Sequence, residues 1–334
     1  MKRQRVDMAD LLAWKNLSLA VYKAARGKRS RPDVAGFLSD VDGNITNLRD
    51  RIQSGSFSLD QYRRFQIMDP KPRNITALSF EMRVLHHAIM NLIGENLIRS
   101  QIHSSFACMP GRGVHAAARY VQRGLRRSGW YVKIDIEKYF ERMPHDRLKQ
   151  KLHNRFKGKA FLDLLDAIID SFSERPGQGL PIGALTSQYF ANFFLETADR
   201  FIQGPPYIKS YCRYMDDMIW FTADKTAAKT SLQIAVNFLS GQALKVKDTW
   251  QIQPSRHGVT YCGYRILPFS ILLSRRKKRN YRRRLRQWED QWRNGNISDL
   301  ALQRGYDAVH GMTAQTRSVG FRKSVIAAGP LLDV

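Results

Sequence analysis

Two apolar runs on either side of an acidic pair constrain the fold of this chain more than any other feature. Residues 211–214 and 218–221 each read as a β-strand, and Asp216 and Asp217 lie between them. A short polar segment between two apolar strands is typical of a β-hairpin with a tight turn. Adjacent carboxylates repel each other unless water screens them or a cation lies between them. The pattern therefore predicts a hairpin whose turn carries negative charge, although Asp pairs also occur in ordinary turns.

A further carboxylate follows another apolar strand earlier in the chain. Residues 130–134 are apolar except for Lys133, and Asp135 comes where this strand is expected to end. If Asp135 and Asp216 face each other on neighbouring strands, they could hold two divalent ions about 3.5 to 4 Å apart, an arrangement suited to in-line displacement at phosphorus. Hard cations prefer oxygen ligands. We therefore predict a site for two Mg²⁺ ions, which Mn²⁺ could replace.

The chain is strongly basic, with 55 Lys and Arg against 29 Asp and Glu in 334 residues and a net charge of +26. Nucleic acid is the polyanion expected to neutralise such a charge, although an acidic membrane surface or a solubility role also fits the total. The charge is densest in residues 275–293, which predict a helix with cations nearly all round and a stripe formed by Tyr281, Leu285, Trp288 and Trp292. Such a helix suits a phosphate backbone; the alternative is a solvated surface helix.

Several function classes are disfavoured by composition. No apolar run approaches the roughly 18 residues of a membrane span, and the charged start does not resemble a signal peptide, so we expect a cytoplasmic protein without a membrane partner. The chain has three cysteines, Cys108, Cys212 and Cys262, which are far apart and predict core thiols rather than a zinc site. Adjacent His86 and His87 would point to different faces of a helix, which favours packing over metal binding.

Periodicity predicts the remaining elements. Apolar spacing indicates helices over residues 8–25, 33–53, 80–98 and 189–198, a strand over 62–68 and a turn over 69–73. Hydrophobic residues make up 43% of the chain, enough for a sizeable core. Short strands scattered among longer helices predict an α+β fold.

Six segments, in the expected order, resemble the motifs of reverse transcriptases. Tyr214-Met215-Asp216-Asp217 resembles the catalytic motif, and Asp135 followed by Phe140 resembles the motif that supplies the first carboxylate. The other four segments resemble the fingertip segment, the next finger motif, the glycine loop of motif B and the primer-gripping hairpin, and they are residues 71–73, 105–115, 179–188 and 261–266. Because they span most of the chain, the resemblance is specific.

The resemblance implies a role for each matching residue. The catalytic residues would be Asp135, Asp216 and Asp217, and the metal-binding positions would be these three together with Ile136. Phe140 would exclude a ribose 2′-hydroxyl, and the full set of nucleotide-binding residues would be Lys71, Arg73, Phe140, Ile182, Gly183 and Gln188. The residues that contact template or primer would be Arg112, Tyr214, Met215, Gly263, Tyr264, Arg275, Arg276, Lys277, Arg282, Arg283 and Arg284. Lys245 or Lys247 is a candidate acid for the leaving group, or else a solvated strand residue.

The implied architecture is a right-hand polymerase with fingers, a palm containing a small antiparallel sheet, and a helical thumb. Residues 1–30 would form an N-terminal helical extension, 31–267 the interleaved fingers and palm, and 268–334 the basic thumb. No segment is left for RNase H, integrase or endonuclease, so those activities would come from other proteins. The expected activity is RNA-directed DNA synthesis, with template RNA, the cDNA/RNA duplex and dNTPs as partners.

Motif B departs from the common pattern of the family. Ile182 stands where many members carry Gln, and Ser187-Gln188 stands in place of Ser-Pro. This form resembles the bacterial or phage-encoded enzymes of diversity-generating retroelements, which misincorporate opposite template adenine and work with a structured RNA and a small basic accessory protein. Ile182 could instead be a packing variant. A phage-defence reverse transcriptase is the alternative, and a noncatalytic RNA-binding scaffold is disfavoured by the complete set of carboxylates.

Overall fold

The computed structural model describes residues 3–68 and 72–328, and it combines helices with small, mostly antiparallel sheets. Contacts divide the chain into two compact units. The first unit comprises Met1–His103, Ile136–Arg200 and Ala235–Lys247, and the second comprises Ser104–Asp135, Phe201–Ile234 and Asp248–Val334. The predicted α+β fold class is confirmed.

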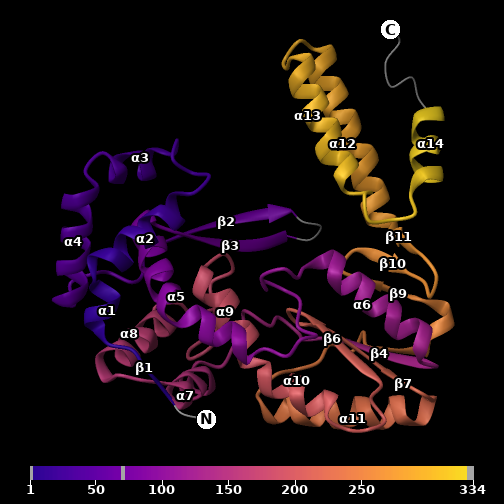
Figure 1. Cartoon of the computed structure of the whole chain (residues 1–334), viewed down its shortest axis with the longest axis horizontal. Coiled ribbons are helices and arrows are strands. Elements are labelled where there is room, and N and C mark those ends of the chain that lie inside the picture. The colour runs from indigo at the N-terminus through magenta and orange to yellow at the C-terminus, as the bar shows by residue number, and fades with distance from the viewer. Residues whose placement is uncertain (1–2, 69–71, 329–334) are drawn as a thin grey trace. The chain divides into compact units, whose positions relative to one another are not determined.

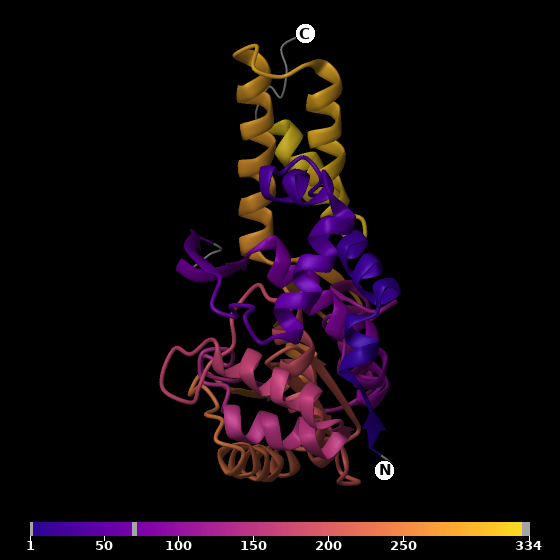
Figure 2. The same cartoon turned by 90° about the vertical axis from the view of Figure 1, so that its left-hand side faces the viewer.

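The first unit is mainly helical. Its helices are α1 (Met8–Leu12), α2 (Trp14–Ala25), α3 (Pro32–Leu38), α4 (Val41–Gln53), α5 (Phe80–Ser100), α7 (His145–Arg155), α8 (Lys159–Asp170) and α9 (Leu185–Phe194). The central α5 packs against α2 and α9, and α7 packs against α8 (Figure 2). Its strands are β1 (Gln4–Arg5) paired with β5 (Phe156–Lys157), and β2 (Tyr62–Met68) paired with β3 (Pro72–Leu78) in an antiparallel hairpin (Figure 1).

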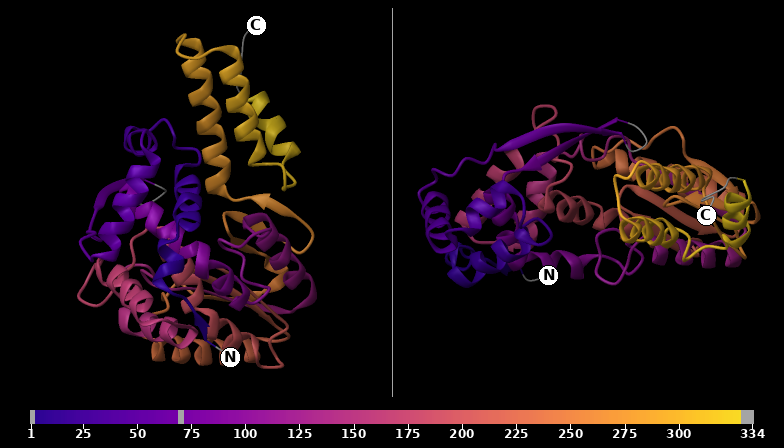
Figure 3. Two further views of the ribbon diagram at one scale, coloured as in Figure 1. Left: turned by 60° about the vertical axis from the view of Figure 1, so that its left-hand side comes forward. Right: turned by 90° about the horizontal axis from the view of Figure 1, so that it is seen from above.

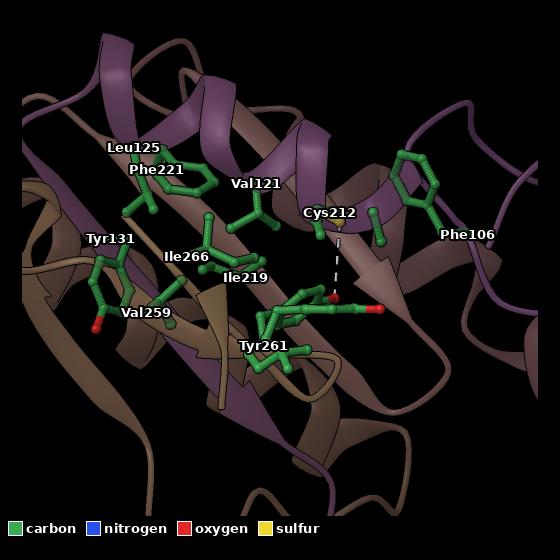
Figure 4. Close-up of a cluster of buried hydrophobic side chains, with 14 residues drawn as sticks. Phe106, Val121, Leu125, Tyr131, Cys212, Ile219, Phe221, Val259, Tyr261 and Ile266 are labelled. Atoms are coloured by element: carbon green, nitrogen blue, oxygen red, sulfur yellow. Dashed lines mark hydrogen bonds between the residues drawn. The ribbon is translucent and has the colours of Figure 1, made fainter. Parts of the chain in front are cut away.

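The second unit is built around a four-stranded antiparallel sheet with the order β6-β7-β4-β8. These strands are β4 (Trp130–Asp135), β6 (Ser210–Tyr214), β7 (Asp217–Thr222) and β8 (Gln251–Pro254). Helix α6 (Val114–Arg127) packs its apolar face on this sheet (Figure 4). Its Gly124 has no room for a side chain, because a Cβ there would lie 2.4 Å from the Phe221 ring.

A second, three-stranded sheet shares this core. It consists of β9 (Val259–Tyr261), β10 (Tyr264–Ile266) and β11 (Ile271–Leu273) and follows the short helix η1 (Ser255–His257). Val259, Tyr261 and Ile266 are buried together with Val121 and Leu125 of α6 (Figure 4). Hydrophobic burial therefore joins both sheets of this unit to one helix.

Three helices end the described part of the chain. They are α12 (Arg275–Arg293), α13 (Asp299–Gly311) and α14 (Val319–Ala327), and the right-hand view of Figure 3 shows them end-on. Tyr281 and Leu285 of α12 are buried with Val309 of α13 in a small apolar cluster. The predicted helix over residues 275–293 is confirmed, and Ser274 caps it by accepting a hydrogen bond from the Lys277 backbone N–H. Two more helices, α10 (Glu196–Gln203) and α11 (Lys225–Gly241), contribute residues to both units.

Four sequence-based expectations need correction. The helix predicted over 8–25 is two helices, because Ala13 has an extended ψ of 136° that no local signal announces. The helix predicted over 33–53 divides at Asp40, whose carboxylate accepts a hydrogen bond from the Gly43 N–H and starts α4. The helix predicted over 189–198 begins earlier, at Leu185, and ends at Phe194. Cys108 is exposed rather than a core thiol, whereas Cys212 is buried as expected.

Candidate functional site

The predicted acidic hairpin is present in the second unit. Strands β6 and β7 pair in antiparallel register, and Met215, with a φ of 58°, makes the tight turn between them. Strand β7 also pairs with β4, and this register sets Asp135, the last residue of β4, opposite Asp217, the first residue of β7. Because directly opposed residues of an antiparallel pair lie about 5 Å apart on one face, the register brings together carboxylates from distant parts of the chain. Asp216 occupies the turn beside them.

Asp217 lies in an environment that disfavours its charge. Burial, together with the neighbouring carboxylates of Asp135 and Asp216, raises the pKa of Asp217 to about 7, although Lys133 opposes the shift. The Lys133 ammonium lies 3.3 Å from Oδ1 of Asp217. The Asp217 side chain is 24% exposed, and a half-buried carboxylate beside other carboxylates is stabilised by additional positive charge.

These residues fit a hard divalent cation by their chemistry. Asp135, Asp216 and Asp217 offer only oxygen donors, and Mg²⁺ is commonly held by one or two carboxylates together with substrate phosphates. Within residues 3–68 and 72–328, no group of three or more His, Cys, Asp or Glu side chains forms a ready-made metal cluster. The ligands present would therefore need substrate oxygens to complete the coordination of an ion.

Buried polar side chains hydrogen-bond to the backbone of the acidic turn, and the sequence analysis did not select them as site residues. The Arg213 side chain is fully buried, and its guanidinium donates a hydrogen bond of 3.1 Å to the Met215 carbonyl. The Tyr261 hydroxyl donates one of 2.8 Å to the Asp217 carbonyl. Arg213 and Lys133 could have been found from the sequence, because each is a single cation in an otherwise apolar strand. A cation in a buried strand needs a polar partner.

The predicted nucleotide-binding residues lie in the first unit. The Ile182 carbonyl accepts a hydrogen bond of 2.9 Å from the Thr76 N–H of β3. Gly183 follows with a φ of +120°, and a Cβ there would lie 2.9 Å from the Thr76 carbonyl oxygen. Glycine therefore allows the motif B loop to approach the hairpin closely. The Phe140 carbonyl accepts a hydrogen bond of 2.7 Å from the Leu180 N–H at the other end of the same loop.

The fingertip prediction can be followed only in part. Lys71 lies outside the described residues. Arg73 belongs to β3, where it pairs with Ile67, so it lies in a strand rather than in the predicted turn.

A cavity of about 1000 Å³ lies beside the motif B loop in the first unit. Gly183 and Gln188 line it together with residues of β2, β3 and α5, including His86 and His87. His86 is buried, its Nδ1 lies 2.9 Å from the Thr186 hydroxyl, and burial lowers its pKa to about 3. A neutral imidazole that packs against motif B agrees with a packing role for this histidine.

A second cavity, of about 730 Å³, lies in the second unit beside the predicted primer-gripping hairpin. Asp217 lines it together with Gly263 and a set of cations, which are Lys133, Arg265, Arg275, Arg276 and Lys278. The predicted hairpin is present as β9 and β10. A cavity with one carboxylate among so many cations can accept an anion such as a phosphate.

The cations of α12 divide into two kinds. Arg275, Arg276, Arg282, Arg283 and Arg284 are exposed. Lys277 and Lys278 are half-buried: the Lys277 ammonium lies 3.4 Å from the centre of the Tyr264 ring, and the Lys278 ammonium lies 5.4 Å from that of the Phe321 ring. Arg112, another predicted template contact, donates a hydrogen bond of 2.9 Å to the Ser105 carbonyl.

The candidate acid Lys245 belongs to the first unit and already has an acidic partner. Its ammonium lies 3.1 Å from the Glu137 carboxylate, and its side chain is 59% exposed. The other candidate, Lys247, ends the last segment of that unit.

Comparison with known proteins places this geometry in a family. The profile described as "Reverse transcriptase (RNA-dependent DNA polymerase)" matches residues 68–266, more than half of the chain. The chain belongs to the reverse transcriptase family. Members of this family use divalent metal ions such as Mg²⁺. The match includes the acidic hairpin and the motif B loop, and it stops before α12.

Individual relatives of this reverse transcriptase are distant. "Protein YkfC" of Escherichia coli is 25% identical over 231 residues, which cover 65% of this chain and 55% of YkfC. The "Uncharacterized 91 kDa protein in cob intron" of Schizosaccharomyces pombe is 27% identical over 122 residues, which cover 35% of this chain and 15% of that protein. The chain thus spans at most about half the length of these relatives. Apo telomerase from Candida tropicalis, truncated of its C-terminal domain, aligns with a TM-score of 0.49 and 14% identity over 64% of this chain and 55% of that chain.

One negative finding bears on the membrane. None of the helices within the described residues is long and apolar enough to cross a bilayer.

Proposed function

We propose that this protein is an RNA-directed DNA polymerase that joins deoxynucleotides to the 3′-hydroxyl of a primer. The observation that carries the proposal is the strand register that sets Asp135 opposite Asp217, with Asp216 in the adjoining turn, inside the segment that matches the family. In a two-metal site for phosphoryl transfer, the protein supplies carboxylate ligands such as these on neighbouring strands.

Asp135, Asp216 and Asp217 would hold the divalent ions, and the backbone carbonyl of Ile136 would add an oxygen ligand. Two such ions, Mg²⁺ or Mn²⁺, would make the primer hydroxyl more nucleophilic and stabilise negative charge on the leaving pyrophosphate. Arg213 and Tyr261 would keep the backbone of the turn in place through their hydrogen bonds to the carbonyls of Met215 and Asp217.

The first unit would select the nucleotide. Phe140 would exclude the ribose 2′-hydroxyl, and Lys71 and Arg73 would neutralise the triphosphate because cations stabilise phosphate charge. Gly183 would allow the backbone to border the nascent base pair, with Ile182 and Gln188 beside it. Lys245 or Lys247 remains the candidate proton donor to the leaving pyrophosphate.

The basic surfaces of the second unit would hold template RNA and the cDNA/RNA duplex. Arg112, Tyr214, Met215, Gly263 and Tyr264 would lie on the palm side, and the exposed arginines of α12 would contact the phosphate backbone. Residues 268–334 would then act as a thumb after a finger and palm region over 31–267 and an N-terminal extension over 1–30.

We further propose that the enzyme belongs to a diversity-generating retroelement, in which it would act with a structured RNA and a small basic accessory protein. Ile182 favours this assignment, because an apolar side chain supplies no hydrogen bond to position the template or the nucleotide. A phage-defence role is the alternative. Sequencing of cDNA made on a defined RNA separates them: errors concentrated opposite adenine, and reduced by Ile182→Gln, favour the retroelement, whereas sparse and evenly spread errors favour defence.

The activity is tested with Asp216→Ala on an RNA template with primer, dNTPs and Mg²⁺. We expect no detectable cDNA, with unfolding and RNA affinity close to wild type. Asp163→Ala, which removes an exposed carboxylate of α8, is the matched control and should leave synthesis unchanged. Unimpaired synthesis by Asp216→Ala would overturn the metal assignment, and RNA binding without synthesis by the wild-type protein, with its RNA and protein partners present, would favour a scaffold.

A further inference from the structure

Lys277 differs from Arg275 and Arg276 in the first turn of α12. Arg275 and Arg276 are exposed, whereas the Lys277 ammonium lies 3.4 Å above the centre of the Tyr264 ring. An ammonium at this distance from an aromatic face makes a cation–π contact, which strengthens when water is excluded. The Tyr264 hydroxyl in turn lies 3.2 Å from Nδ1 of His115 on α6. Lys277 thus contacts the β9–β10 hairpin instead of extending into solvent.

The turn of that hairpin is shaped to receive the lysine. Cys262 and Gly263, its two central residues, have φ values of 48° and 77°, as a type I′ turn requires. A Cβ on Gly263 would lie 2.8 Å from Cε of Lys277, so the lysine would have to leave its position over the turn. The absence of a side chain at Gly263 therefore permits the turn conformation and also leaves room for the lysine stem.

The contact has an electrostatic cost. Burial lowers the pKa of Lys277 to about 8, and Arg276 lowers it as well. Burial and the charge of Lys277 also lower the pKa of His115. A lysine that only contacted phosphate could stay in water at no cost, as Arg275 and Arg276 do, so the inward position of Lys277 indicates a role within the protein.

We propose that Lys277 is a positioning residue: its cation–π contact with Tyr264, over Gly263, fixes the first turn of α12 on the β9–β10 hairpin. The lysine is then not one of the phosphate contacts. This inference rests on the proposed function, since it assigns the hairpin to the primer and the exposed arginines of α12 to the duplex. Because α12 is fixed on the β9–β10 hairpin, the primer contacts of the hairpin and the duplex contacts of α12 keep a constant distance from each other before nucleic acid binds.

Loss of the contact should lower the fraction of molecules that are ready to bind. The apparent dissociation constant equals the intrinsic one divided by that fraction, so affinity falls without the loss of any phosphate contact. From the usual strength of a partly desolvated cation–π contact, we expect Lys277→Met to raise the dissociation constant for an RNA–DNA duplex about 3- to 10-fold.

The dependence of affinity on salt distinguishes positioning from phosphate binding. Each phosphate contact that is lost reduces the slope of log K against log salt by about 0.7 to 0.9. We expect the slope of Lys277→Met to equal that of wild type, while the matched control Arg284→Met, one exposed cation fewer on the same helix, loses about one contact from its slope. A slope reduced equally in both variants would overturn the proposal, because Lys277 would then be an ordinary phosphate ligand.

A double-mutant cycle tests the contact without nucleic acid. Gly263→Ala forces a Cβ against Lys277, so it should lower the folding equilibrium constant of the full chain at least 3-fold more in wild type than in a Lys277→Ala background. Equal effects in both backgrounds would show that the two residues are not coupled and would overturn the inference. Denaturant unfolding measures this coupling whether or not the protein makes cDNA. A failure of the proposed activity can therefore be distinguished from a failure of the positioning role.

Discussion

Replacing Asp217 by asparagine should stabilise the metal-free protein while it abolishes polymerisation. Burial holds the pKa of Asp217 at about 7 in the folded chain, against an ordinary value of 3.8. The unfolded chain therefore releases this proton at lower pH than the folded chain does. Because the folded state binds more protons between about pH 4 and pH 7, the free energy of unfolding falls as pH rises through this window.

The size of the effect follows from that difference. About 3 pH units at roughly 1.4 kcal/mol each give an upper value of about 4 kcal/mol above pH 7. That pKa already includes the effect of the Lys133 ammonium, which lies 3.3 Å away. We therefore expect Asp217→Asn to be more stable than wild type by up to about 4 kcal/mol at pH 8 and nearly equal to it at pH 4.

Urea unfolding in the presence of EDTA, at a series of pH values from 4 to 8, measures this difference. Asp163→Asn, a change at an exposed carboxylate, is the control and should follow the pH dependence of wild type. Added Mg²⁺ should stabilise wild type more than Asp217→Asn, because a ligand stabilises the state that binds it. If the two proteins differed by the same amount at every pH, the pKa of Asp217 would not be raised in the folded chain, and the reasoning would be wrong.

The remaining predictions concern the basic helix and two glycines. Neutralising the exposed arginines of α12, Arg282, Arg283 and Arg284, should weaken binding of RNA–DNA duplexes of any sequence. Filter binding over a salt series should show the slope of log K against log salt reduced by about 2 to 3. An unchanged slope would mean that the helix is only a solvated surface helix. Gly124→Ala should destabilise the protein by about 1 to 3 kcal/mol in chemical denaturation, because its Cβ would lie 2.4 Å from the Phe221 ring, whereas Gly36→Ala in α3, with open space around it, should be neutral or stabilising. Gly183→Ala should lower kcat/KM for nucleotide incorporation roughly 10-fold without changing duplex affinity, because it strains the motif B loop against Thr76. Unaltered incorporation would show that this loop does not belong to the nucleotide site.

Local pattern was sufficient wherever the signal lay within one element. Apolar periodicity and turn residues predict the strand that ends at Asp135, the hairpin around Met215 and the helix Arg275–Arg293. It failed where an interruption carried no strong signal: Ala13 divides one predicted helix although alanine is an excellent helix former. The residue types of the acidic site were also readable, because carboxylates after apolar strands are costly without a cation.

The sequence by itself determined the acidic turn, the basic helix and the order of motifs that places the chain among reverse transcriptases. Only the tertiary structure decided the pairing of Asp135 with Asp217, the burial of Arg213 behind the turn and the position of Lys277 over Tyr264. Each of these depends on which strand or helix lies beside another, and that choice is made by packing between segments far apart in the chain. Residue type sets what a side chain can do, whereas its neighbours in the folded protein set its charge, its partner and therefore its role.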